Sequence, residues 1–379
     1  MLDGKIGMRD CIKMDKKIRV LHTECTNSFG GQEIRIINEI LMMQSAGFEM
    51  FLAAKKDKPL AKEAKKRGIK VFELPFRGYW DIETFLKLIY LIKKYNIDII
   101  NTHGSQNTWL GGIAGKLSGI KFVRSRHMSV PISKSKLNFI NRLADFIITT
   151  GEHIKENMIK DNGISPEKIV SIPSSVDVNI FNPEIYDKHE ARAKFGLDKK
   201  ALIVGKLAHI REQKGFQEFI EVAGILAKKY TNLLFVIGGD GNEALKERLK
   251  KRIKTLNIED RVIFLGHIDN PELFLKAIDI FLFTSHTEGL PQSVTQALMM
   301  NLPTIATNVG STSDLSNGKN MILVEAKDVD GISKALENLI ISPEVRESLS
   351  KIARNSIVNS FSLESMRDKT ISVYKKVLD

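Results

Sequence analysis

This chain contains only two cysteines and no long apolar run. Cysteine occurs only at positions 11 and 25 of 379, which argues against a disulfide framework or a Cys-x-x-Cys metal site. No apolar stretch reaches the roughly 18 residues of a membrane-spanning helix. Residues 1–17 carry charges throughout and lack the apolar core of a secretory signal, so we expect an N-terminal tail there. These absences favour a reducing, cytoplasmic location.

Acidic residues are scarce in the first part of the chain, and the formal net charge is +12. Residues 1–150 contain 26 Lys and Arg against 14 Asp and Glu, whereas residues 151–379 contain 31 of each. No helix-turn-helix, zinc or RNA-binding motif accompanies the basic half, so we expect no nucleic-acid partner. An anionic membrane surface or an anionic glycolipid fits this charge. A lysine-rich composition alone produces it as well.

Strand-like and helix-like segments alternate along the first half, which predicts a parallel, doubly wound α/β sheet. The expected strands are Ile18–Thr23, Glu49–Ala54, Lys70–Leu74, Ile97–Thr102, Lys121–Ser125, Ala144–Thr150 and Lys168–Ile172. The expected helices are Gln32–Gln44, Leu60–Arg67, Asp81–Tyr95, Thr108–Leu117 and Glu152–Asp161.

The polar segment 179–200 interrupts this pattern, and we interpret it as a linker between domains 18–178 and 201–360. The second half again alternates. Its expected strands are Ala201–Lys206, Asn232–Gly238, Val262–Leu265, Ile278–Phe283, Thr304–Thr307 and Met321–Val324. Its expected helices are Gly215–Lys229, Asn242–Leu256, Pro271–Ala277, a helix after Pro291 that runs through Met300, Val329–Ile340, Pro343–Ser360 and Leu363–Leu378.

The most informative stretch is Thr284–Gly310, which reads as strand end, tight turn, helix and strand. It places the Glu288 carboxylate and several free backbone N–H groups at the carboxyl end of a parallel strand. Open α/β sheets bind ligands at that edge, and a helix N-terminus attracts phosphate. A second loop of the same kind carries Arg211 and Lys214 between a strand and a helix. A guanidinium there suits phosphate, because its paired N–H groups match phosphate geometry.

These two segments together resemble the donor site of retaining family 4 glycosyltransferases, which have the GT-B fold. The family signature is a Glu, seven residues and a second Glu; here Glu288 is followed by Gln296, which departs from it. The Arg211-x-x-Lys214-Gly loop is similar to the family's diphosphate loop. The resemblance implies two Rossmann-like domains that face each other across a cleft. It also implies that residues 361–379 cross back to the first domain.

The resemblance implies a retaining transfer of sugar from a nucleotide-diphosphate sugar to a glycan or glycolipid hydroxyl, as in surface-polysaccharide biosynthesis, without a metal or other cofactor. Arg211 and Lys214 would stabilise the leaving diphosphate. The ribose would bind Gln296, whose amide can still hydrogen-bond to hydroxyls. Glu288 would hold the donor with the turn and first helical residues. The expected donor-binding residues are Gly30, Gly31, Gly238, Gly266, Gly289, Leu290, Pro291, Gln292, Ser293 and Gln296.

The first domain offers fewer signals. His103 and His127 each follow an expected strand, and a histidine in that position is more often structural. The resemblance nevertheless puts His127 close to the reacting sugar carbon and His103 at a neighbouring acceptor position. Arg124 and Arg126, which stand close to His127 in the sequence, could contact a phosphate group or an acidic acceptor. The apolar run in 84–92 could dock to a membrane, or it could form the core face of a helix.

Three alternatives stay open. A nucleotide-sugar 2-epimerase would use the same fold, with acids and a histidine around the sugar. A dehydrogenase built from two nucleotide-binding units is disfavoured because no Gly-x-Gly-x-x-Gly fingerprint is present. A non-catalytic sugar-nucleotide-binding partner subunit is encouraged only by Gln296.

Overall fold

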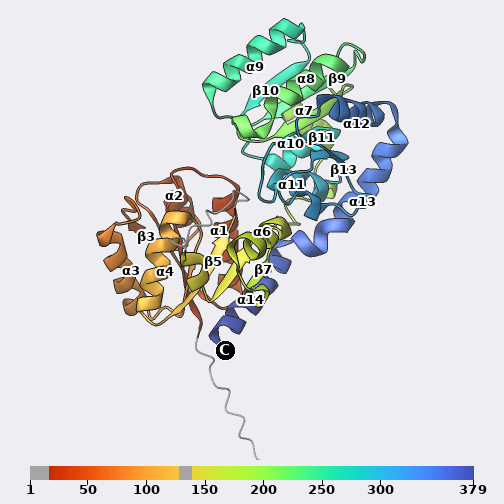
Figure 1. Ribbon diagram of the computed structural model, residues 1–379. Coiled ribbons are helices and arrows are strands. Elements are labelled where there is room, and N and C mark those ends of the chain that lie inside the picture. Colours follow the sequence, from red (N-terminus) through yellow and green to blue (C-terminus); the bar gives the residue numbers. More distant parts are fainter. Residues whose placement is uncertain (1–16, 128–138) are drawn as a thin grey trace, which may run out of the picture.

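The protein, described here by a computed structural model over residues 17–127 and 139–379, contains two parallel β-sheets surrounded by helices (Figure 1). The prediction of two doubly wound α/β units is confirmed. Successive strand residues point to opposite sides of a sheet. Val20 accordingly joins one apolar cluster of the first domain and Leu21 joins the other.

The first sheet has seven strands in the order β3-β2-β1-β4-β5-β6-β7. The order reverses between β1 and β4, and open α/β sheets leave a ligand-binding crevice at such a switch. The strands are β1 (Arg19–Glu24), β2 (Glu49–Lys55), β3 (Lys70–Leu74), β4 (Ile99–Thr102), β5 (Lys121–Arg126), β6 (Phe146–Thr149) and β7 (Ile169–Ser171). The helices are α1 (Gly31–Ser45), α2 (Pro59–Lys66), α3 (Ile82–Lys94), α4 (Ser105–Leu117), α5 (Ile140–Leu143) and α6 (Glu152–Asn162).

The second sheet has six strands in the order β10-β9-β8-β11-β12-β13, with its own reversal between β8 and β11. Its strands are β8 (Leu202–Leu207), β9 (Leu233–Gly238), β10 (Val262–Gly266), β11 (Ile280–Phe283), β12 (Thr304–Thr307) and β13 (Ile322–Val324). Its helices are α8 (Phe216–Leu226), α9 (Glu243–Leu256), α10 (Pro271–Ala277), α11 (Gln292–Met299) and α12 (Val329–Ile341).

The segment 179–200, expected as a linker, packs on the second domain. It contains α7 (Lys188–Lys194), which lies against α10, and Phe181 and Leu197 enter an apolar cluster of the second domain. The chain therefore approaches that domain before residue 179. At this crossing Val176 donates a backbone hydrogen bond to the carbonyl of Phe361 (3.0 Å).

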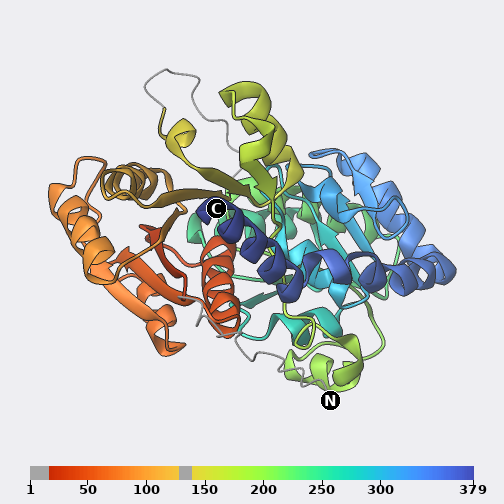
Figure 2. The ribbon, with the colours of Figure 1, turned by 90° about the horizontal axis from the view of Figure 1, so that it is seen from below.

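The last two helices link the domains a second time. α13 (Pro343–Phe361) packs on α11, and α14 (Leu363–Leu378) begins after Ser362, whose hydroxyl accepts a hydrogen bond from the backbone N–H of Ser365. α14 then lies along α1 of the first domain (Figure 2). Met366 and Tyr374 are buried in the same cluster as Val20. The C-terminal helix thus completes the apolar core of the N-terminal domain.

No helix within the described ranges is both long and apolar enough to cross a membrane.

Candidate functional site

The carboxyl ends of β8 and β11 bring the two predicted signature loops together. The Nζ of Lys214 donates to a carboxylate oxygen of Glu288 at 2.5 Å, and both side chains are mostly buried. Lys214 belongs to a short 3-10 turn, Glu212–Lys214, that leads into α8. Residues 74 positions apart in the chain therefore form one ion pair at the edge of the sheet where ligands bind.

A glycine fixes how these loops fit together. Gly215 adopts a left-handed conformation (φ +63°), and a Cβ on it would lie 1.7 Å from the backbone oxygen of Thr284. Any other residue would separate the two loops, so Gly215 is needed for the contact between Lys214 and Glu288.

A buried lysine, Lys206, lies near the Lys214–Glu288 pair and was not predicted from the sequence. Lys206 is 1% exposed, and its Nζ donates to the hydroxyl of Thr284 at 2.7 Å. That hydroxyl in turn donates to the carbonyl of Gly215. Burial, and then the charge of Lys214, lower the pKa of Lys206 to about 7. The sequence signal was a lysine inside the apolar strand Leu202–Leu207, where a solvated cation is not expected.

The helix expected after Pro291 is present as α11, which begins at Gln292. Gln292, Ser293 and Gln296 are half-buried and share one face of α11, since residues three and four apart are neighbours on a helix. Leu290, at 8% exposure, belongs to the apolar core, so its side chain packs inward. Pro291 is the N-cap and has no N–H to offer.

The first domain meets this turn directly. A Cβ on Gly289 would lie 2.2 Å from the backbone oxygen of His127, and one on Gly31 would lie 3.8 Å from the side chain of Gln292. Gly30 is the N-cap of α1, and its N–H donates to Glu33 at 2.7 Å. Burial raises the pKa of Glu33, and the charge of Arg211 from the other domain opposes that rise. Arg211 itself is exposed. Gly31, Gly289 and His127 thus lie at the boundary between the domains.

The two predicted histidines are in contact. His103 Nδ1 lies 2.8 Å from His127 Nε2, and His103 Nε2 lies 2.8 Å from Nδ1 of a third histidine, His22 on β1. Burial lowers the pKa of all three. His22 was missed because it reads as an ordinary residue of a buried strand.

The two predicted arginines differ. Arg124 is 3% exposed, and its guanidinium donates to the backbone carbonyls of Thr102 and Gly104, so it supports the turn after β4. Burial lowers its pKa to about 9. Arg126 is half-buried. A further buried acid, Glu24, follows the same edge at the end of β1; burial and the neighbouring Glu33 raise its pKa to about 7.

Two of the predicted donor glycines lie at the ends of β9 and β10. A Cβ on Gly238 would come within about 3 Å of Ile268, Leu207 and Phe274, so close packing accounts for this glycine. Gly266 has a positive φ (+72°) and open space beside it, and its carbonyl accepts from the N–H of Gly239 at 2.7 Å.

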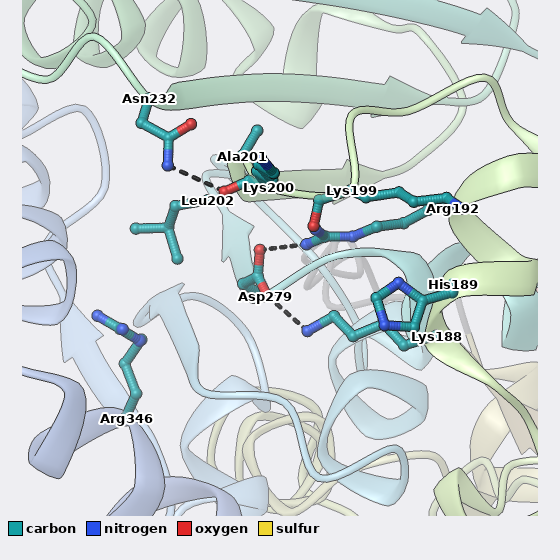
Figure 3. Close-up of a pocket in the computed structure, with 10 residues that line it drawn as sticks. All are labelled: Lys188, His189, Arg192, Lys199, Lys200, Ala201, Leu202, Asn232, Asp279 and Arg346. Atoms are coloured by element: carbon teal, nitrogen blue, oxygen red, sulfur yellow. Dashed lines mark hydrogen bonds and ion pairs between the residues drawn. The ribbon is translucent and has the colours of Figure 1, made fainter.

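The cavity shown in Figure 3 lies away from these residues. It has a volume of about 440 Å³, and Asp279 at its centre accepts from Lys188 and Arg192. Asp279 precedes β11 and Leu202 begins β8, so the cavity opens at the amino ends of the strands. Ligands of open α/β sheets bind at the opposite edge. We interpret this ion-pair cluster as the attachment of α7 to the sheet.

Comparison with known proteins agrees with the arrangement. Residues 29–180 match the family described as Glycosyltransferase Family 4, and residues 187–356 match the family described as Glycosyl transferases group 1. A UDP-Gal:alpha-D-GlcNAc-diphosphoundecaprenol alpha-1,3-galactosyltransferase from Escherichia coli is 28% identical over 94% of this chain and 97% of its own. The capsular polysaccharide biosynthesis glycosyltransferase CapM from Staphylococcus aureus is 26% identical over 83% of this chain and 84% of its own.

Solved structures agree on the fold. A glycosyltransferase from Rickettsia africae superposes with a TM-score of 0.88 at 21% identity, covering 96% of this chain and 99% of its own. HepE from Anabaena, in complex with UDP, superposes with a TM-score of 0.85 at 17% identity, covering 95% of this chain and 100% of its own. The chain belongs to the glycosyltransferases of the GT-B fold, with a family 4 domain followed by a group 1 domain.

Proposed function

We propose that the protein is a retaining glycosyltransferase that moves a sugar from a nucleotide-diphosphate sugar to a hydroxyl of a glycan or glycolipid acceptor. The observation that carries this proposal is the Lys214–Glu288 pair at the carboxyl ends of β8 and β11, with Arg211 and the N-terminus of α11 beside it. The relatives named above support it: one is named for UDP-Gal, and HepE is described in complex with UDP and with UDP-glucose. Surface-polysaccharide synthesis is the setting that the names of these relatives favour.

In the proposed reaction the bond between the anomeric carbon and the diphosphate oxygen breaks. A bond to the acceptor oxygen forms on the same face, and the acceptor's proton passes to the departing diphosphate. Arg211 and Lys214 would stabilise the charge that develops on the diphosphate, and we assign this task to them without a metal ion. Glu288 has one oxygen held by Lys214, which suits positioning of the donor sugar better than nucleophilic attack.

The first test is donor binding, measured as thermal stabilisation by a panel of UDP-, GDP-, ADP- and CMP-sugars and NADH. We expect one sugar nucleotide to stabilise the protein selectively. Arg211→Ala and Lys214→Ala should each lower kcat by about 10²- to 10³-fold, the usual loss when one stabilising donor is removed. Lys229→Ala is the matched control, because Lys229 pairs with Glu337 on the surface of the same domain.

Other outcomes identify the alternatives. Stabilisation by NADH alone would favour the dehydrogenase, and turnover of a sugar nucleotide without an acceptor would favour the 2-epimerase. If the natural protein is inactive and Gln296→Glu gains activity, the protein is a non-catalytic binder. No stabilisation by any sugar nucleotide would contradict the proposal.

We further propose that α3 carries the enzyme to an anionic membrane surface that holds the acceptor, on the cytoplasmic side. One face of α3 is buried through Leu88, Leu91 and Ile92. The other face and the turn before it expose Trp80 (93%), Ile82 (71%), Leu86 (58%), Tyr90 (57%) and Tyr79 (52%). The buried face of α3 fits the interpretation of residues 84–92 as core, and the exposed face fits their interpretation as a membrane-docking surface. Apolar and aromatic side chains beside lysines are typical of helices that lie at a membrane surface.

A further inference from the structure

Three histidines from three neighbouring strands contact one another in a row. His22 lies on β1, His103 follows β4 and His127 follows β5. The ring centroids of His22 and His103 are 5.0 Å apart, and those of His103 and His127 are 5.1 Å apart. The two nitrogen pairs that join the rings are each separated by 2.8 Å. Each contact needs one donor and one acceptor, so the three tautomers depend on one another.

The deep end of this row is fixed by Tyr374 of α14. The Tyr374 hydroxyl accepts from Asn101 Nδ2 at 2.9 Å and donates to Glu39 at 3.1 Å. Reversing the Asn101 amide would turn its Oδ1 toward the Glu39 carboxylate, to which Nδ2 now donates at 3.4 Å. Glu39 receives the Tyr374 hydroxyl on Oε1, while its Oε2 lies 3.7 Å from the guanidinium of Arg35.

The ring protons can now be assigned from this end. The Tyr374 hydroxyl has a single proton, which it donates in the hydrogen bond to Glu39. His22 Nε2, 3.4 Å from the phenol oxygen, must therefore be the donor in that contact. His22 Nδ1 is then an acceptor, so His103 donates from Nε2 and accepts at Nδ1. His127 must in turn donate from Nε2 and keep a lone pair on Nδ1.

We propose that His22, His103 and Tyr374 are positioning residues that hold His127 in the tautomer protonated on Nε2, so that its Nδ1 accepts a hydrogen bond from a hydroxyl of a bound substrate. Among the described residues, His127 Nδ1 is buried without a hydrogen-bond partner. Native structures rarely leave such an atom unpaired. Because Gly289 of the second domain meets the backbone of His127, the ring lies at the domain boundary.

The state of the rings agrees with this assignment. Burial lowers the pKa of each histidine, so all three are neutral at ordinary pH and each has one ring proton to place. The opposite direction would make His127 Nδ1 a donor. It would require the Tyr374 proton to point at His22, and the hydroxyl would then have no proton left for its hydrogen bond to Glu39. The role in sugar transfer rests on the proposed function, whereas the tautomer does not.

The decisive experiment is nitrogen NMR of the protein labelled with ¹⁵N-histidine, with His127→Gln used to assign the resonances. We expect His127 to be protonated on Nε2 and unprotonated on Nδ1 in the protein without ligand. Protonation on Nδ1 would overturn the proposal. This measurement needs no turnover, so its failure is distinct from failure of the transferase assignment.

A variant far from the substrate tests the role. Tyr374→Phe removes the acceptor for His22, whose Nε2 is 3.9 Å from Glu39 and too far for a hydrogen bond. We expect two tautomers of His127 and about a fivefold lower kcat, equivalent to one ordinary hydrogen bond, with the donor KM unchanged. Thr370→Val is the control, because Thr370 is buried on the same helix and its hydroxyl donates to the carbonyl of Met366 one turn earlier. Equal losses of kcat in both variants would show a purely structural role.

Discussion

At the scale of single residues, Lys206 is the side chain most at odds with its surroundings. Its Nζ lies 5.0 Å from the ring centroid of Phe216 and 5.9 Å from that of Phe283, so apolar rings surround most of the charge. Its folded pKa of about 7 is well below the usual value for lysine. The unfolded chain therefore binds more protons than the folded one at every pH between these two values.

This difference predicts a pH dependence for Lys206→Met. The cost of burying the lysine is fully present below pH 7 and declines as the pH rises toward 10. We expect the variant to be more stable than the natural protein by a few kcal/mol at pH 7, with the advantage shrinking toward pH 10. Urea unfolding at both pH values measures it, with Lys229→Met as the exposed control. An advantage that does not change with pH would mean that Lys206 keeps its proton in the folded protein, with a pKa that burial does not lower.

At the scale of elements, α3 gives a prediction for membrane binding. Ile82→Ser with Leu86→Ser removes two exposed apolar side chains from one face and leaves the buried face intact. Each lost insertion is worth about 1.5 kcal/mol or more, so binding to vesicles should fall at least tenfold. Flotation with vesicles containing anionic lipid measures this, and added salt should weaken binding by the natural protein.

Ile341→Ser provides the matched control, since Ile341 is 60% exposed but lies on α12 of the second domain. Equal flotation of all three proteins, or none by the natural protein, would remove the proposed role of α3.

The alternation of apolar strands and amphipathic helices was sufficient to predict both sheets. The helices α5 and α7 were not predicted: α5 has only four residues, and α7 lies in a polar segment without an apolar periodicity. α4 begins at Ser105, three residues before its predicted start, since Asn107 bonds back to the N–H of Gly104 and extends the helix. Local sequence shows poorly where such a turn begins.

The site was predictable in part. Arg211, Lys214 and Glu288 stand in recognisable loops, and the structure brings them to one edge. The residues that continue the row beyond His103 could not be predicted, because Tyr374 and His22 are 352 positions apart and meet through the packing of α14. Arg124 was expected at the acceptor, but its hydrogen bonds to backbone carbonyls depend on the three-dimensional course of the chain after β4.

At the scale of the whole molecule, the two domains meet at a second point, where the N–H of Glu152 donates to Asp314 at 2.7 Å. Beside it, a Cβ on Gly151 would lie 2.0 Å from the hydroxyl oxygen of Ser311. Gly151 has extended backbone angles that any residue can adopt, so alanine would be a wedge between the domains without local strain.

Gly151→Ala should therefore hold the domains apart. We expect kcat/KM to fall by about ten- to a hundredfold, because small displacements of catalytic groups are costly. Small-angle scattering should show a larger radius of gyration with donor bound. Gly78→Ala is the control, since nothing lies within 4 Å of a Cβ there. Unchanged kinetics and dimensions would mean that this contact does not govern domain closure.

The position of α14 also affects how the protein is made. The ribosome produces the strands of the first sheet early, but Met366 and Tyr374, which fill that domain's core, are translated after the whole second sheet. Nascent domains usually fold in the order of their synthesis. The core of the first domain can therefore be completed only after the last helix has been made.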